Sequence, residues 1–243
     1  MKTPENSSLF SKRVDEKSGV SYYVLTKRIA GFQQGFYFVN NSMTNDGRYL
    51  WFYASFPPVF DSALRQLGVI DFETDEMYLC HDTLFEHASP YVNPETGEIY
   101  FTWKGSIYKR GPKKEDCTEH LTTIPTKGAH NHISTHITFT PDNKEIMLDV
   151  REGNSNFYVG TYNLETKQFT KWADSPFMMN HGQLNPVNPD LSLHAYDYYT
   201  DTVTGEACAI PLDKTSGNDD PRTIKKIATT FIKVKRSHMR SKS

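Results

Sequence analysis

The chain has 243 residues and a formal net charge of −2, so composition gives no electrostatic reason to expect nucleic acid as a partner. Hydrophobic residues make up 37% and aromatic residues 13%, which is typical of a folded globular protein rather than a disordered one. No apolar run reaches the ~18 residues that a membrane-spanning helix needs, so we expect no membrane partner either.

The N-terminal segment, residues 1–21, is polar, and we expect it to form a tail or a partial strand. It begins Met-Lys-Thr-Pro-Glu-Asn and lacks the apolar core of a signal peptide. The expected location is therefore cytoplasmic, or periplasmic or secreted if a signal peptide has been removed.

A four-fold repeat occupies residues 22–212. Each copy consists of a short strand, a turn rich in Asn, Pro, Asp and Gly, and a second strand. Each turn carries one acidic residue, and successive acids are 49, 47 and 48 residues apart: Asp46, Glu95, Asp142 and Asp190. A period near 48 built from short strands is typical of the blades of a β-propeller.

The second half of the repeat shows the same periodicity. Residues 67–79 parallel residues 158–170, and their Glu-Thr turns begin at Glu73 and Glu165, 92 residues or about two periods apart. We therefore predict an all-β fold, a β-propeller of four-stranded antiparallel blades. Four blades are visible, which predicts a fragment of a larger, seven-bladed propeller. A β-sandwich with accidental spacing is the alternative.

The C-terminal segment, residues 213–243, lacks the turn pattern. It starts as a polar, linker-like run and becomes basic from Lys225 onward. We expect a polar and basic tail. A disordered tail, a partner-binding arm and out-of-place sequence after a truncation all fit this composition.

Histidines recur just before the first strand of three successive blades, at His87, His136 and His181. Their separations of 49 and 45 residues follow the repeat, so we expect these side chains to lie around the mouth of the propeller's central channel. Imidazole is both a common metal ligand and a ready general base. A structural role, in which each histidine bonds to a neighbouring blade, is the alternative.

The loops between the second and third strands of the blades carry cations and aromatic rings on the same predicted face. The cations are Arg65, Lys104 and Arg151, and the blade-4 loop contains Tyr198. Guanidinium groups bind carboxylates in a bidentate manner, and aromatic faces suit sugar rings. This pattern favours an acidic oligosaccharide or polysaccharide as the ligand, although long polar side chains in loops are often only solvated.

Three stretches resemble the propeller-fold polysaccharide lyases, above all oligogalacturonate lyase and more loosely ulvan lyase. They are residues 40–52, with the turn Thr-Asn-Asp-Gly, residues 136–143, His-Ile-Thr-Phe-Thr-Pro-Asp-Asn, and residues 180–190, which begin Asn-His-Gly-Gln. The resemblance implies β-elimination on a uronate sugar, with a divalent metal such as Mn²⁺ or Ca²⁺ in the channel.

The resemblance also implies roles for individual residues. His136 and His181 are the expected metal ligands, with Gln183 and His87 as weaker candidates. His132 is the expected base, while Arg151 would bind the uronate carboxylate and Tyr198 would act as acid or base. The family's Gln-x-x-His-x-His run is not reproduced here, and family members are longer than this chain.

Two functions therefore follow from the sequence. The first is a monomeric carbon–oxygen lyase that cleaves uronate-containing oligosaccharides or polysaccharides. The second is a non-catalytic propeller that binds protein or glycan, or an inactive truncated lyase.

Overall fold

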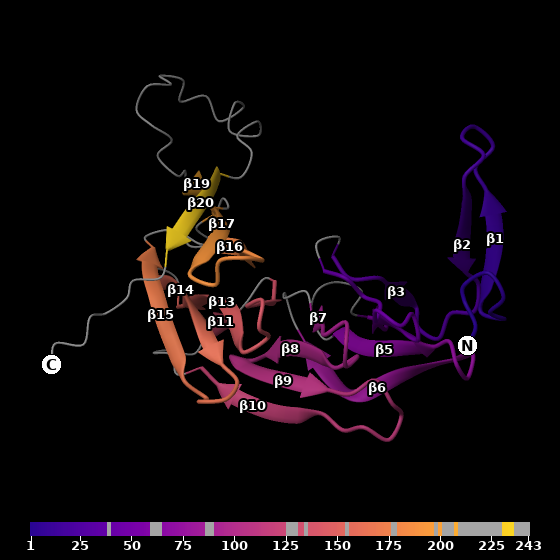
Figure 1. Ribbon diagram of the computed structural model, residues 1–243, viewed down its shortest axis with the longest axis horizontal. Helices are drawn as coiled ribbons and strands as arrows, with labels where there is room; N and C mark the ends of the chain where they lie inside the picture. The colour runs from indigo at the N-terminus through magenta and orange to yellow at the C-terminus, as the bar shows by residue number, and fades with distance from the viewer. Residues whose placement is uncertain are drawn as a thin grey trace, which may run out of the picture. The chain divides into compact units, whose positions relative to one another are not determined.

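The computed structural model describes residues 1–37, 40–58, 65–85, 90–124, 131–133, 136–153, 156–175, 179–196, 199–200, 207–208 and 230–235. All regular elements in these segments are β-strands, and the segments contain no helix long and apolar enough to cross a membrane. The chain divides into two compact units, Met1–Thr123 and Ile124–Ser243, which are described separately (Figure 1).

The first blade of unit 1 is a four-stranded antiparallel sheet in which sequence neighbours are also sheet neighbours. Its strands are β3 (Phe32–Gln34), β4 (Tyr49–Ser55), β5 (Arg65–Asp71) and β6 (Glu76–Phe85). The inner strand is interrupted, because β3 pairs with the end of β4 while Met43 forms a separate bridge with Leu50.

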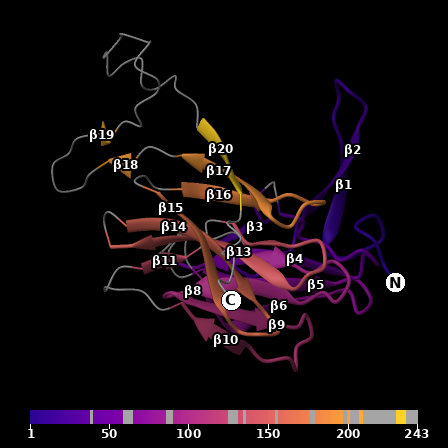
Figure 2. The ribbon, with the colours of Figure 1, turned by 60° about the vertical axis from the view of Figure 1, so that its left-hand side comes forward.

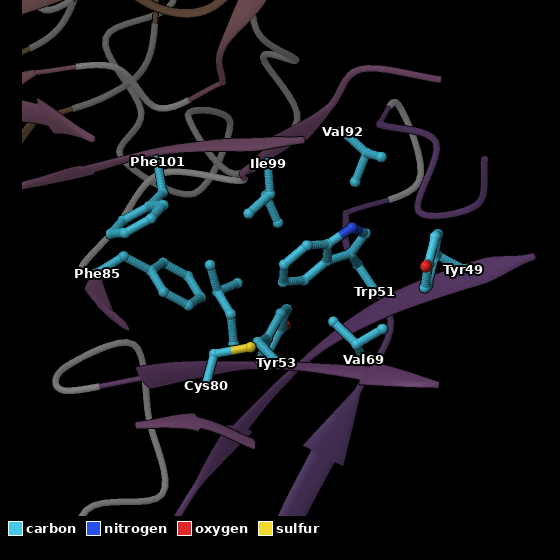
Figure 3. Close-up of a cluster of buried hydrophobic side chains, with 10 residues drawn as sticks. Tyr49, Trp51, Tyr53, Val69, Cys80, Phe85, Val92, Ile99 and Phe101 are labelled. Carbon is cyan, nitrogen blue, oxygen red and sulfur yellow. The ribbon is translucent and has the colours of Figure 1, made fainter. Parts of the chain in front are cut away.

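The second blade repeats this meander and packs on the first. Its strands are β7 (Tyr91–Val92), β8 (Ile99–Trp103), β9 (Ser106–Arg110) and β10 (Glu119–Thr123). Trp51 of β4 points between the two sheets towards Val92 and Ile99 (Figure 3). Its side chain is 0% exposed, and its indole Nε1–H donates to the Gly97 carbonyl at 2.9 Å. Apolar burial and one satisfied indole N–H thus join the two blades.

The N-terminal segment covers the other face of the first blade. Strand β1 (Phe10–Val14) pairs with β2 (Ser21–Leu25) to form a hairpin, and Leu9 and Phe10 pack against Phe72 and its neighbours. Asp75 anchors this segment, accepting hydrogen bonds from Lys2 Nζ at 2.6 Å and from the Ser7 hydroxyl at 2.5 Å. Within residues 1–21, strand β1 is thus the part that joins this hairpin.

Unit 2 begins with a third blade of the same kind. Two short pieces, β11 (Asn131–Ile133) and β12 (Thr138–Phe139), pair in turn with β13 (Glu145–Glu152), and the sheet continues with β14 (Asn156–Asn163) and β15 (Phe169–Ser175). The inner strand of this blade is therefore split, like that of the first.

The last blade differs from expectation in its outer half. Strands β16 (Met179–Leu184), β17 (Leu191–Tyr196) and β20 (Thr230–Lys235) form one sheet, while β18 (Tyr199–Thr200) and β19 (Ala207–Cys208) form a separate pair (Figure 2). Strand β20 lies inside the segment expected to be a tail. Its sequence, Thr-Phe-Ile-Lys-Val-Lys, is rich in β-formers, and the free edge of β17 supplies its pairing partner.

The repeated turns are structural. Asp46 accepts hydrogen bonds from Thr44 Oγ1 at 2.6 Å and from the Arg48 amide at 2.9 Å. Asp142 repeats this arrangement with Thr140 and the Lys144 amide. In both turns the threonine hydroxyl is the main cause of a lowered aspartate pKa. Local side-chain hydrogen bonds therefore explain why these sequences recur.

Candidate functional site

The candidate site lies where the inner strand of a blade is broken. In the first blade Asn40 lies between β3 and the bridge at Met43, and in the third blade His136 lies between β11 and β12. In the last blade the register of β16 against β17 shifts between Asn180 and Gln183. His181 lies in that bulge with φ +50°, a conformation that non-glycine residues rarely adopt. Asn40 and His136 thus lie at breaks in the inner strands of their blades, and His181 lies at a bulge in β16.

His136 and His181 face each other across two blades of unit 2. His136 Nε2 lies 2.5 Å from His181 Nδ1, and the rings stack with centroids 4.6 Å apart at an angle of 26°. His136 is 3% exposed, whereas His181 is half-buried. Burial first, and then the neighbouring His181, lower the pKa of His136 to about 4. His136 is therefore neutral at pH 7, and the pair forms one short hydrogen bond.

A second buried histidine lies beside the pair. His194 of β17 is 0% exposed, its Nε2 lies 2.9 Å from the Ser192 hydroxyl, and burial lowers its pKa to about 4. Gly182 packs directly on this ring, because a Cβ there would lie 2.9 Å from His194 Cε1. The same Cβ position is 3.7 Å from Asp149 Oδ1, which places this buried carboxyl group next to the bulge. The missing side chain at Gly182 allows this close approach.

The two buried histidines make stability depend on pH. Their folded-state pKa values near 4 lie below the unfolded value of about 6.5, so the unfolded chain binds more protons between these limits. The contribution of the two neutral histidines to the free energy of unfolding is therefore complete above pH 6.5, and it is lost as the pH falls towards 4. We expect the free energy of unfolding to fall by up to ~1.4 kcal/mol per pH unit for each histidine.

Urea unfolding followed by circular dichroism at pH 7, 6, 5 and 4 measures this loss. A His194→Gln variant, which cannot titrate, should show a shallower decline over that range. An unchanged slope in the variant would contradict the assignment to His194.

The remaining predicted site residues are distributed as follows. Arg151 of β13 is opposite His132 of β11 in the register, and its Nε donates to the Gly153 carbonyl at 3.0 Å. Gln183 also belongs to β16, where pairing with β17 resumes after the bulge that contains His181. His87 and Tyr198 lie outside the described residues, and the side chain of His132 is likewise not described.

Asp149 and Arg151 lie on the same face of β13. Residues two apart in a strand share a face, so Arg151 lies about 7 Å along the strand from Asp149, which borders Gly182. Sequence reasoning missed Asp149. Its signal was an acid in the otherwise apolar run Ile-Met-Leu-Asp-Val, which is unusual for a buried strand.

Two predicted cations of unit 1 are held on aromatic rings. The Arg65 guanidinium lies 4.4 Å from the centroid of the Tyr53 ring, and Lys104 Nζ lies 5.2 Å from that of Trp103. Tyr53 lies two residues before the end of β4, and Trp103 is the last residue of β8. Each pairing is a cation–π contact that fixes the direction of a flexible side chain.

The two facing nitrogens of the histidine pair, His136 Nε2 and His181 Nδ1, are hydrogen-bonded to each other. No group of three or more His, Cys, Asp or Glu side chains is placed to hold a metal among the residues that the structure describes.

No family model and no curated protein matches the chain. Among solved structures, it is similar to the β-propeller domain of Cps50 (Swd1) from Myceliophteria thermophila, with a TM-score of 0.51 and 11% identity over 76% of this chain and 59% of that one. The fold is a β-propeller.

Two other solved structures are similar to this propeller at lower TM-scores. TolB from Acinetobacter baumannii matches with a TM-score of 0.48 and 14% identity, over 85% of this chain and 50% of TolB. Dipeptidyl peptidase 4 from Porphyromonas gingivalis matches with a TM-score of 0.46 and 10% identity, over 85% of this chain and 38% of the peptidase. The propeller thus spans about half the length of TolB. None of the three named proteins is a polysaccharide lyase, and identities this low show the fold alone.

Proposed function

We propose that this propeller is a lyase that cleaves uronate-containing oligosaccharides by β-elimination, with His181 as the base. The observation that carries the proposal is the hydrogen bond between His136 and His181 at the break in the inner strands. A buried neutral imidazole beside a half-buried one resembles the base-and-orienting-group pairs of many enzymes.

The hydrogen bond would set the tautomer of His181. If His181 Nδ1–H donates to His136 Nε2, the tautomer of His181 carries its lone pair on Nε2, which is the nitrogen proposed to take a proton. The low pKa of His136 keeps this acceptor neutral, and neutral His136 would stabilise the imidazolium that forms on His181. His136 is then a positioning residue, and no step requires a metal.

Arg151 would hold the uronate carboxylate. A guanidinium group bound to the carboxylate partly neutralises its negative charge, which makes the C5 proton of the sugar more acidic. The support for this role is that Arg151 lies two residues along β13 from Asp149, whose carboxyl group borders Gly182, the neighbour of His181.

The proposed reaction balances without a further reactant. His181 Nε2 takes the C5 proton, and the electron pair of that C–H bond forms the C4=C5 double bond. The C4–O bond breaks, and the leaving oxygen takes a proton from the imidazolium or from water. The product is an unsaturated uronate at the new non-reducing end.

The test is to incubate the purified chain with oligogalacturonate, and separately with ulvan, and to follow the ultraviolet absorbance of the unsaturated product. We expect product formation that EDTA does not abolish. An absence of product from both polymers, with EDTA, with Mn²⁺ and with Ca²⁺, would reject the lyase.

A second candidate is a non-catalytic propeller that binds an acidic glycan. One observation favours it: Asn40, at the equivalent break in the first blade, donates through Nδ2 to the Pro90 carbonyl of the next blade at 2.9 Å. The histidine pair could be the same kind of tie between blades. Binding of oligogalacturonate without product formation, measured by calorimetry, would support this alternative.

A further inference from the structure

The hairpin of β1 and β2 projects from the first blade of unit 1 (Figures 1 and 2). Its base is fixed, because Phe10 stacks on Phe72 with centroids 5.9 Å apart. Beyond that base, large apolar side chains face solvent: Val14 is 55% exposed, Val20 60% and Tyr22 48%. A two-stranded sheet is marginally stable alone in water, so exposed apolar side chains on such a sheet point to a partner.

The alternation of hydrogen-bonded residue pairs between β1 and β2 shows which backbone groups of the hairpin face outward. The Asp15 amide donates to the Val20 carbonyl, and the Thr26 amide donates to the Leu9 carbonyl, both at 2.9 Å. Bonded and non-bonded pairs alternate in an antiparallel ladder. The N–H and C=O groups of Tyr23 therefore point away from β1, towards the outer edge of β2. Within the described residues β2 pairs with β1 alone.

The two edges of the hairpin differ in their protection. Strand β1 carries Lys12 and Arg13, and charged side chains at an edge oppose strand addition. Strand β2 reads Ser-Tyr-Tyr-Val-Leu, with no charge and no proline. Its aromatic and β-branched residues favour extended pairing, so β2 is the edge that accepts a further strand.

The charge of the hairpin indicates what kind of strand it accepts. Residues 10–28 contain five Lys and Arg residues and two acidic residues. Asp15 keeps its charge while accepting hydrogen bonds in the turn from the Ser18 amide at 2.7 Å and the Lys17 amide at 3.1 Å, and Lys12 Nζ also lies 3.9 Å from Glu5 Oε1. The surplus of positive charge disfavours a second copy of the same hairpin and favours an acidic partner.

We propose that the outer edge of β2, Ser21–Leu25, binds an extended acidic segment of a partner protein as an added antiparallel or parallel strand. The backbone groups of β2 provide the affinity, and the cations of the hairpin select acidic side chains. This surface belongs to the N-terminal hairpin and is independent of the histidine pair.

The test uses two fluorescein-labelled eight-residue peptides, one of alternating valine and glutamate and one of alternating valine and lysine, with binding to the full chain measured by fluorescence anisotropy. We expect the acidic peptide to bind and the basic one not to bind. Tyr23→Pro removes the outward N–H without removing a bond inside the hairpin, and should weaken binding about 10-fold or more. Tyr23→Thr keeps the N–H and serves as the matched control. A Lys12→Glu, Arg13→Glu variant should lose binding to the acidic peptide while keeping its circular dichroism spectrum.

Several results would overturn the proposal. Equal binding of both peptides would contradict the role of charge. Equal binding by the proline and threonine variants would contradict the role of the β2 edge. If Tyr23→Pro unfolds, Tyr23→Glu tests the same edge by repelling the acidic peptide, and unaltered binding by that variant would reject the site. A concentration-dependent dimer in analytical ultracentrifugation that the proline variant loses would assign the edge to a second copy instead.

Discussion

Replacing His181 with alanine is expected to lower the turnover of oligogalacturonate about 10²–10⁴-fold, because the variant removes the group proposed to take the C5 proton. The structure places this imidazole within a hydrogen bond of a buried neutral histidine, so its orientation is fixed before substrate binds. The measurement is the steady-state kcat for unsaturated product over a pH series.

Variants of His136 separate positioning from chemistry. His136→Ala should lower kcat less than His181→Ala does and should shift the pH profile. His136→Asn keeps an acceptor for His181 Nδ1–H and should recover part of the rate. His120→Ala is the matched control, since His120 is exposed in unit 1 and bonds to Thr123. Equal kcat for wild type and His181→Ala would contradict the assigned base.

Replacing Trp51 with alanine is expected to cost about 3–5 kcal/mol of the free energy of unfolding of unit 1, because it leaves a large cavity between two blades. Trp51 is 0% exposed and packs among Tyr49, Val69, Val92 and Ile99. The change also leaves the Gly97 carbonyl without its indole donor. Urea unfolding followed by far-ultraviolet circular dichroism measures the loss.

Two further variants make the Trp51 experiment specific. Trp51→Phe keeps most of the apolar volume but removes the N–H, so it should cost clearly less than alanine. Trp103→Ala changes a half-buried tryptophan at the end of β8 and should have a smaller effect than Trp51→Ala. A loss below about 1 kcal/mol for Trp51→Ala would mean that the two blades do not depend on this contact.

The propeller fold could be predicted because its signal is local. The turn at Asp46 is closed by Thr44 and by the amide of Arg48, all within five residues, and Asp142 repeats it with Thr140. Strand β20 could not be placed in the same way. Its partner is β17, and nothing in residues 230–235 specifies which free edge they join. Pairing of distant strands depends on the whole sheet, which sequence periodicity does not describe.

The candidate site was predictable in part. Equal phase in the repeat placed His136 and His181 at corresponding points of successive blades, and the structure brings them into contact. Whether they share a proton or a metal depends on separations of tenths of an ångström, which spacing in sequence does not fix. Asp149 escaped the prediction because a buried polar group is recognised by its surroundings, here the close approach of Gly182.

The pairing of β17 with β20 has a consequence for how this blade tolerates change. Tyr196 and Thr230 are opposite each other in the ladder, so the intervening chain leaves and returns at one point, with Cα atoms about 5 Å apart. Closing a longer loop between two fixed ends adds little entropic cost, about 0.6 kcal/mol for each doubling of its length. A whole additional module could therefore be grafted there, and the blade would keep its third strand.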